Sequence, residues 1–190
     1  MKRFAVLALA TATAFTMVNA QAETYTIDPA HTNVNFSIDH MGVTTNRGNF
    51  TELSGVVDYN PQAKTGFVGI TIPVATLQTN VSTFTNHLKG KDFFNAAQYP
   101  SAYFKSTKWH FDGDKPSKIE GELTLLGKTN PVTLTATKFG CYDNPILQAK
   151  SCGGDFTTTI DRTQWGMDTY AQFADMKHVK LDIQIEAYKK

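Results

Sequence analysis

The stretch KIEGELTLLGKTNPVTLTAT, residues 118–137, decides the fold class of this chain. Apolar side chains alternate with charged or polar ones on both sides of the turn-forming sequence GKTN at 127–130. Because successive side chains of a strand point to opposite faces, this period-two pattern predicts two strands, each with one apolar face. The stretch therefore predicts an antiparallel hairpin whose sheet buries a single side.

Strand-like runs of the same kind extend in both directions from this hairpin. The alternation is clearest in VKLDIQIE at 179–186, and further runs are found at 34–38, 54–59, 67–72, 102–105 and 156–161, with a short leader at 24–27. With the hairpin these make eight main strands, joined by connections that are mostly short enough for antiparallel neighbours. Eight such strands can close on themselves, which removes the sheet edges and encloses either a packed core or one ligand. The chain is therefore predicted to be an all-β protein built on an eight-stranded antiparallel barrel.

One segment, at about 75–97, departs from the alternation. Its apolar residues follow helical spacing, which predicts a short helical insert, with a helix that stops at Gly90. Asp92 can then start another helical turn that carries Phe93 and Phe94. The predicted apolar face consists of Val81, Phe84 and Leu88, with Asn80 or Ser82 as the N-cap. Such an insert either closes one end of the barrel as ordinary core or covers the entrance to a ligand site.

A second irregular stretch, 162–177, is long for a connection between strands. It carries five large side chains that are apolar or amphipathic, namely Trp165, Met167, Tyr170, Phe173 and Met176. The composition is compatible with a movable wall beside a ligand and equally with a small satellite core.

The N-terminus has the pattern of a secretory signal peptide. Lys2 and Arg3 precede an uncharged, alanine-rich run at 4–18, and Ala20-Gln21-Ala22 matches a small-x-small cleavage site. The apolar run is short for a bilayer span, and no cysteine follows it that could carry a lipid anchor. We therefore predict a signal peptide at 1–22 and an exported domain at 23–190, without a stable membrane anchor.

Export changes the meaning of Cys141 and Cys152, which flank a turn-rich stretch between two predicted strands. In an oxidising compartment the default expectation is a disulfide that closes this loop. A metal pair or a redox couple is the alternative, although metal sites need more ligands and redox pairs are typically spaced as CxxC.

Composition and motifs give little sign of catalysis or of nucleic-acid binding. Lysine and arginine (18) nearly balance aspartate and glutamate (17), so there is no basic stripe for a nucleic acid. Common nucleophile, zinc-protease, phosphate-loop and dinucleotide motifs do not occur, and the five histidines are scattered singly. We accordingly expect neither catalytic residues nor a metal site.

The predicted barrel instead offers an apolar interior, either fully packed or open for a hydrocarbon. Small inward residues, Ala102, Gly121 and Ala136, favour an open centre. Candidate lining residues, taken from the predicted inward faces and the two irregular segments, are Phe36, Ile38, Val57, Ile70, Ile72, Phe84, Leu88, Phe93, Phe104, Leu123, Leu125, Leu134, Phe156, Ile160, Trp165, Phe173, Leu181 and Ile183. Candidate contacts for a polar headgroup are His87, Lys91 and Arg162.

An ordered series of short motifs resembles the YceI-like family over essentially the whole exported chain. The matching pieces are Tyr25-Thr26-Ile27-Asp28 with His31, Val34-Asn35-Phe36, Arg47-Gly48-Asn49-Phe50, His87-Leu88 with Asp92-Phe93, Tyr99-Pro100, Phe104-Lys105-Ser106-Thr107, Gly121-Glu122-Leu123-Thr124 with Gly127-Lys128-Thr129 and Pro131-Val132, and Ile160-Asp161-Arg162 with Trp165-Gly166. The family has no agreed catalytic residues, so none are transferred.

The resemblance implies a lipocalin-like barrel that binds a polyisoprenoid lipid in an internal pore, typically in the bacterial periplasm. The pair Cys141 and Cys152, together with the segment TTTIDR at 157–162, is most similar to members associated with isoprenoid quinones such as ubiquinone. The expected ligand is therefore an isoprenoid quinone or polyprenyl lipid, bound without a covalent cofactor. Carriage or storage of this lipid is the favoured role. A quinone-dependent redox accessory or enzyme is the alternative, and transient membrane contact and a homodimer are compatible with either.

Overall fold

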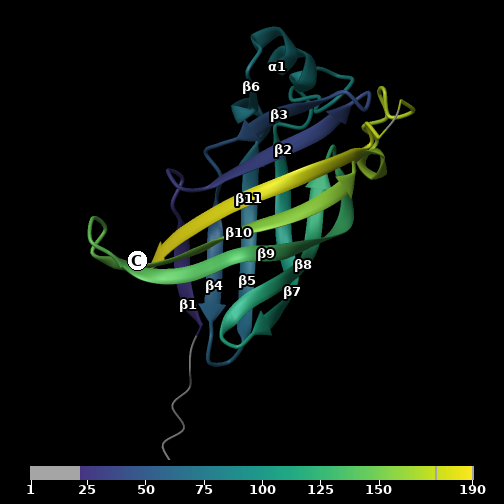
Figure 1. Ribbon diagram of the computed structural model, residues 1–190. Coiled ribbons are helices and arrows are strands. Elements are labelled where there is room, and N and C mark those ends of the chain that lie inside the picture. The colour runs from purple at the N-terminus through teal and green to yellow at the C-terminus, as the bar shows by residue number, and fades with distance from the viewer. Residues whose placement is uncertain (1–21, 174, 190) are drawn as a thin grey trace, which may run out of the picture.

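The computed structural model describes residues 22–173 and 175–189 (Figure 1). The predicted signal peptide, apart from Ala22, lies outside these described residues. Within them, no helix has the length and apolar character that a bilayer crossing requires.

The described chain is mostly strand, with one short α-helix and two 3₁₀ turns. The strands are β1 (Glu23–Ile27), β2 (Asn33–His40), β3 (Thr44–Phe50), β4 (Ser54–Asn60), β5 (Thr65–Pro73), β6 (Gln78–Thr79), β7 (Ser101–Asp112), β8 (Lys115–Leu125), β9 (Lys128–Asn144), β10 (Ala149–Asp161) and β11 (His178–Lys189). The helical elements are η1 (Val74–Thr76), α1 (Ser82–Lys89) and η2 (Arg162–Trp165).

Eight of these strands form a closed antiparallel ring, which confirms the predicted barrel. The pairing order is β1-β4-β5-β7-β8-β9-β10-β11, and β11 pairs with β1 to complete the circle. In Figure 1, α1 and β6 lie at the top end of the barrel and β1 lies towards the opposite end. The decisive stretch 118–137 forms most of β8 and the first half of β9, in register from Lys118 opposite Thr135 to Leu125 opposite Lys128.

Three positions of the ring are occupied by strands that bend and continue after a break. In one series, β11 pairs with β1, β1 with β4, and β4 with β5. In the other series, β11 pairs with β2, β2 with β3, and β3 with β6. The breaks lie at 28–32, at 51–53 and at η1 with Leu77. The upper wall therefore consists of β2, β3 and β6, and the lower wall of β1, β4 and β5.

This arrangement corrects two details of the sequence analysis. The run at 24–27 is not a leader outside the barrel, because β1 closes the ring against β11. β3 was not predicted as a strand, because its sequence TTNRGNF holds one large apolar residue and shows no alternation. Its ladder with β2 runs unbroken from Val34 opposite Phe50 to His40 opposite Thr44.

The helical insert is also shorter than expected, since α1 covers only Ser82–Lys89 within the predicted 75–97. Neither Asn80 nor Ser82 is the N-cap, because the capping position is Val81, whose side chain makes no capping bond and is 55% exposed. Thr79 stabilises the entry instead, since its hydroxyl lies 2.8 Å from that of Thr85 and donates to the Val81 carbonyl. Gly90 ends the helix as predicted.

The predicted disulfide is present between Cys141 on β9 and Cys152 on β10, which are directly opposite each other in the ladder. It braces the long hairpin near its turn. Both strands belong to the ring, so the bridge fastens the part of the barrel wall that lies beside β1 and the C-terminal end of β11.

Candidate ligand cavity

The main cavity of the barrel has a volume of about 240 Å³, and α1 forms part of its wall. Its wall combines side chains of β2, β3, β5, β7, β8, β10 and β11 with α1, the turn after α1 and the connection 162–177. The lining residues are Val34, Phe36, Ile38, His40, Asn46, Phe50, Ile72, Phe84, His87, Leu88, Phe93, Phe94, Ala102, Leu123, Leu125, Ile160, Arg162, Met167, Tyr170, Met176, Val179 and Leu181. Most of them are aliphatic or aromatic, which suits a hydrocarbon ligand.

Two smaller cavities of about 50 and 30 Å³ follow further inside the barrel. Val34, Ile72, Leu123 and Leu181 line both the main and the middle cavity, and Leu134 and Ile185 line both the middle and the deepest one. The interior is therefore a row of three apolar cavities that shared side chains divide. A packed and an open interior are both compatible with the alternation of the strands, and the structure combines the two.

The predicted lining residues are distributed over the three cavities, with two exceptions. Phe36, Ile38, Ile72, Phe84, Leu88, Phe93, Leu123, Leu125, Ile160 and Leu181 line the main cavity. Ile70, Phe104 and Ile183 line the middle one, Val57 and Phe156 the deepest one, and Leu134 both. Trp165 and Phe173 line none of the three, because Trp165 is buried behind the wall and Phe173 is 44% exposed.

Some lining residues were not found by sequence reasoning. His40, Asn46 and Phe50 belong to the hairpin of β2 and β3, whose second strand was missed. Phe94 lies in the turn after α1, where its ring packs edge-on against that of Phe50 with 5.3 Å between centroids. His40 continues the period-two spacing of Phe36 and Ile38, but its polar side chain conceals this continuation. Asn46, Phe50 and Phe94 lie in segments without a clear alternation.

Gly121 does not leave space in the interior, contrary to the expectation for a small inward residue. A Cβ atom at this position would collide with the ring of Phe104 and lie 2.6 Å from the carbonyl oxygen of Lys105. The Phe104 ring therefore already fills the volume above the glycine. Ala102, which is buried on β7 and lines the main cavity, is the small residue that leaves room for a ligand.

Arg162 is the charged residue among those that line the main cavity, and it is only 4% exposed. Its Nε donates to the carbonyl oxygen of Met176 at 2.8 Å, and its two terminal nitrogens donate to Met167 at 2.5 Å and Thr169 at 2.7 Å. Burial lowers its pKa from the ordinary value, with Asp168 and Asp161 acting in the opposite direction. Arg162 therefore fastens the connection 162–177 around the cavity.

The other predicted headgroup residues lie differently. His87 lines the cavity, and its ring packs edge-on against Phe93 with 5.0 Å between centroids. Lys91 is exposed and does not line the cavity. The structure thus brings Arg162 and His87 together at the α1 end and leaves Lys91 outside.

Two residues next to Arg162 fix the start of the same connection. The Asp161 carboxylate accepts from the backbone N–H of Thr163 at 3.0 Å and from its hydroxyl at 2.6 Å, and these bonds lower the pKa of Asp161. Trp165, 1% exposed, donates its Nε1–H to the carbonyl oxygen of Leu123 at 2.9 Å. Gly166 then ends η2 with a positive φ of 84°.

Known proteins are similar to this chain in sequence or in fold. The model of the YceI-like domain matches residues 25–187. Protein YceI of Escherichia coli O157:H7 is 40% identical over 136 residues, 69% of this chain and 70% of that protein. The crystal structure of the Campylobacter jejuni YCEI protein covers 80% of this chain and 90% of its own, with 26% identity and a TM-score of 0.71. A polyisoprenoid binding domain from Saccharophagus degradans, implicated in plant cell wall breakdown, shares the fold with a TM-score of 0.57 at 12% identity, covering 87% and 98%.

Proposed function

This chain belongs to the YceI-like family, and from that premise we propose that it carries or stores a polyisoprenoid lipid, most specifically an isoprenoid quinone. The lipid is held in the barrel without covalent chemistry, and the protein works in the periplasm after removal of residues 1–22. The observation that carries the proposal is the main cavity, whose wall is almost wholly apolar.

The energetics of this wall favour a hydrocarbon ligand. A void lined by aliphatic and aromatic side chains loses dispersion contacts on one side, and a bound chain supplies them. Each buried methylene adds about 0.8 kcal/mol to binding. A long isoprenoid tail therefore gains affinity from area, and it is too insoluble to cross an aqueous compartment without such a container.

The α1 end suits a ligand with a polar head. A guanidinium has five N–H donors, and backbone carbonyls accept from three nitrogens of Arg162, which leaves donors for a ring carbonyl of a quinone. His87 lines the same part of the wall, and Phe93 and Tyr170 offer aromatic faces beside it. We place the head there and direct the tail towards the middle cavity, past Leu123 and Leu181.

The Saccharophagus domain is consistent with this ligand class, since it is a polyisoprenoid binding domain on the same fold. At 12% identity that likeness concerns the fold alone. The ligand proposed for this chain therefore rests on its own cavity and on the family.

The first test is chemical identification of the bound lipid. Protein purified from the periplasm without detergent is extracted with organic solvent, and the extract is examined by mass spectrometry. We expect an isoprenoid quinone or polyprenyl lipid in the wild type. An Ala102→Leu variant should retain much less lipid, because the added side chain enters the main cavity. The matched control is Ala136→Leu, at a partly buried alanine that lines none of the three cavities.

Four results would contradict the proposal or change it. A wild type that is folded and free of lipid, or equal retention in both variants, contradicts binding in this cavity. Loaded protein that fails to accelerate transfer of quinone between donor and acceptor vesicles favours storage over carriage. Conversion of the quinone to a new product, lost in a His87→Ala variant, would make the protein an enzyme.

A further inference from the structure

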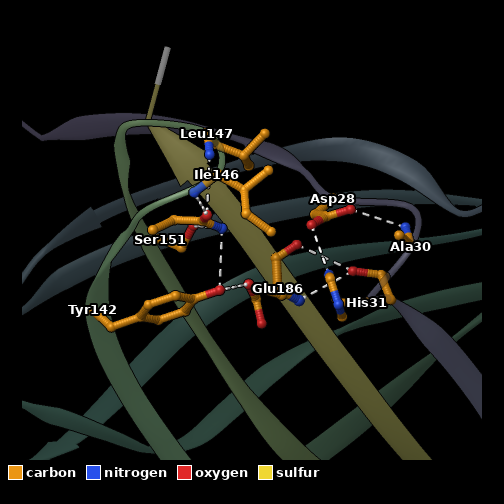
Figure 2. A network of polar contacts seen from close by, with 10 residues as sticks. Asp28, Ala30, His31, Tyr142, Ile146, Leu147, Ser151 and Glu186 are labelled. Atoms are coloured by element: carbon orange, nitrogen blue, oxygen red, sulfur yellow. Dashed lines mark hydrogen bonds and ion pairs between the residues drawn. The ribbon is translucent and has the colours of Figure 1, made fainter.

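A second group of polar side chains lies outside the cavity lining, where β1 gives way to β2. Asp28 and His31 belong to this break, and Glu186 belongs to β11, which runs beside it (Figure 2). One carboxylate oxygen of Asp28, one ring nitrogen of His31 and one carboxylate oxygen of Glu186 all lie within 4.8 Å of one another. None of the three lines a cavity described above.

The backbone beneath this group is fixed by hydrogen bonds between the break and β11. The N–H of Asp28 donates to the carbonyl oxygen of Glu186 at 2.8 Å. Thr32 is buried, with 2% of the residue exposed. Its hydroxyl donates to the same carbonyl at 3.1 Å and accepts from the Glu186 N–H at 3.0 Å. The Asp28 carboxylate also accepts from the Ala30 N–H at 2.9 Å. The three functional side chains therefore project from a rigid frame.

Two of the functional groups are also oriented by side-chain contacts. The Nδ1 of His31 lies 2.8 Å from a carboxylate oxygen of Asp28. The hydroxyl of Tyr142, on β9, donates to a carboxylate oxygen of Glu186 at 2.5 Å, and the side-chain amide of Asn144 donates to that hydroxyl (Figure 2). A hydrogen bond from a neighbouring residue to a ligating carboxylate is the usual support of a metal site.

Other histidine–carboxylate pairs in the described chain lack the third group. His178 lies against Asp175 and His110 against Glu120, but neither pair forms part of a cluster of three metal-ligating side chains within the described residues. The sequence shows no such difference, because Asp28-x-x-His31 and Asp175-x-x-His178 have the same spacing. The pairing of β11 with β1 and β2 brings Glu186 beside the pair of Asp28 and His31.

We propose that Asp28, His31 and Glu186 bind one divalent transition-metal ion, of which Zn²⁺ is the representative. One imidazole nitrogen and two carboxylate oxygens are a donor set that such ions accept, with water completing the coordination shell. Ligands around a tetrahedral zinc are about 3.3 Å apart. Coordination would therefore replace the 2.8 Å contact between His31 and Asp28 and draw the three side chains, which lie within 4.8 Å of one another, around the ion. His31 is exposed enough to rotate, since 58% of its side chain is accessible.

The ion would cross-link the break at 28–32 to β11, at the point where β11 passes from β1 to β2. It would also neutralise two carboxylates that face each other across this junction. Its effect on the barrel is therefore structural, and it is independent of any lipid in the cavity.

The test is titration of untagged, chelator-treated protein with ZnCl₂ in a calorimeter. We expect one ion per chain and a higher Tm in its presence. His31→Ala and Glu186→Gln should each weaken binding by at least about tenfold. The matched control is His178→Ala, which removes the histidine of an equally spaced pair and should bind as the wild type does.

Two further variants keep the result interpretable if one of the first variants unfolds. Asp28→Asn tests the second carboxylate, and Tyr142→Phe should weaken zinc binding by a smaller factor because it retains all three ligands. Absence of binding by the wild type overturns the proposal. Binding that survives both His31→Ala and Asp28→Asn in folded protein, or that His178→Ala abolishes, overturns it equally.

Discussion

The guanidinium of Arg162 lies over the ring of Phe93, with 5.8 Å between the guanidinium carbon and the ring centroid. The connection 162–177 is thereby joined to the turn that follows α1, although some 70 residues separate the two in sequence. The same guanidinium donates hydrogen bonds to three carbonyl oxygens of the connection 162–177. One side chain therefore contacts two parts of the wall of the main cavity, the connection 162–177 and the turn after α1.

Replacing Arg162 with lysine should destabilise the protein although the charge is kept. An ammonium group cannot reach the carbonyls of Met167, Thr169 and Met176 together, so buried acceptors lose their donors. We expect the free energy of unfolding to fall by about 3 kcal/mol, measured by urea denaturation. The control is Arg47→Lys at an exposed position with one weak bond to a carbonyl, where the change should be negligible. An equal loss in both variants would refute the role assigned to Arg162.

The two tryptophans should differ in their response to phenylalanine. Trp165→Phe removes the bond from Nε1 to the Leu123 carbonyl and should cost about 2 kcal/mol. The buried Nε1 of Trp109 has no hydrogen-bond partner among the described residues, so Trp109→Phe loses only packing. We expect the second variant to be more stable than the first by about 1 kcal/mol in thermal or urea unfolding. The reverse order would show that the bond of Trp165 contributes nothing.

Removal of the disulfide should lower stability without opening the ring. Cys141 and Cys152 close a short loop, so the double variant Cys141→Ala with Cys152→Ala should lose about 3 kcal/mol. Reducing agent should affect the wild type and leave the double variant unchanged in the same urea titration. A wild type insensitive to reductant under denaturing conditions would mean that the bridge makes no contribution.

The cap formed by Asp161 should make stability depend on pH in the acid range. Its hydrogen bonds from Thr163 lower the pKa in the folded state, so the stabilisation is complete above the ordinary pKa of an aspartate. It is lost as the pH falls through the lower folded value. Asp161→Ala should therefore cost about 1 kcal/mol at neutral pH, and the difference from the wild type should shrink below about pH 4. Asp161→Asn serves as the control, because an amide oxygen still accepts and does not titrate there.

Alternation of side chains was enough to predict most of the fold, because each ring strand buries one face. It failed for β3, where burial falls on Phe50 and the remaining residues are polar or glycine. It also misjudged Gly121, since residue size does not reveal that the Phe104 ring occupies the adjacent space. The N-cap at Val81 escaped prediction because Thr79 and Thr85 stabilise the turn from outside the usual capping position.

The candidate site was harder to predict, for a physical reason. Strand faces indicate which residues point inward, but they do not indicate where inward side chains touch one another and divide the interior. Leu123 and Leu181, both assigned to the lining by alternation, also form part of the boundary between two cavities. The bonds of Arg162 likewise depend on the path of an irregular segment, which has no periodicity to read.

The break between β5 and β6 leaves one short strand pairing in the barrel wall, that of β3 with β6. Along the upper wall, β3 meets β6 through only two residue pairs, Gly48 with Thr79 and Asn49 with Gln78. Opening this pairing breaks fewer backbone hydrogen bonds than separating β8 from β9, whose ladder holds eight residue pairs. Local unfolding at low free energy is therefore expected to start there, and amide protons of 46–49 and 77–80 should exchange with deuterium faster than those of β8 and β9. A lateral slit at this point would admit a long chain sideways, so that the ligand need not thread end-first through the barrel.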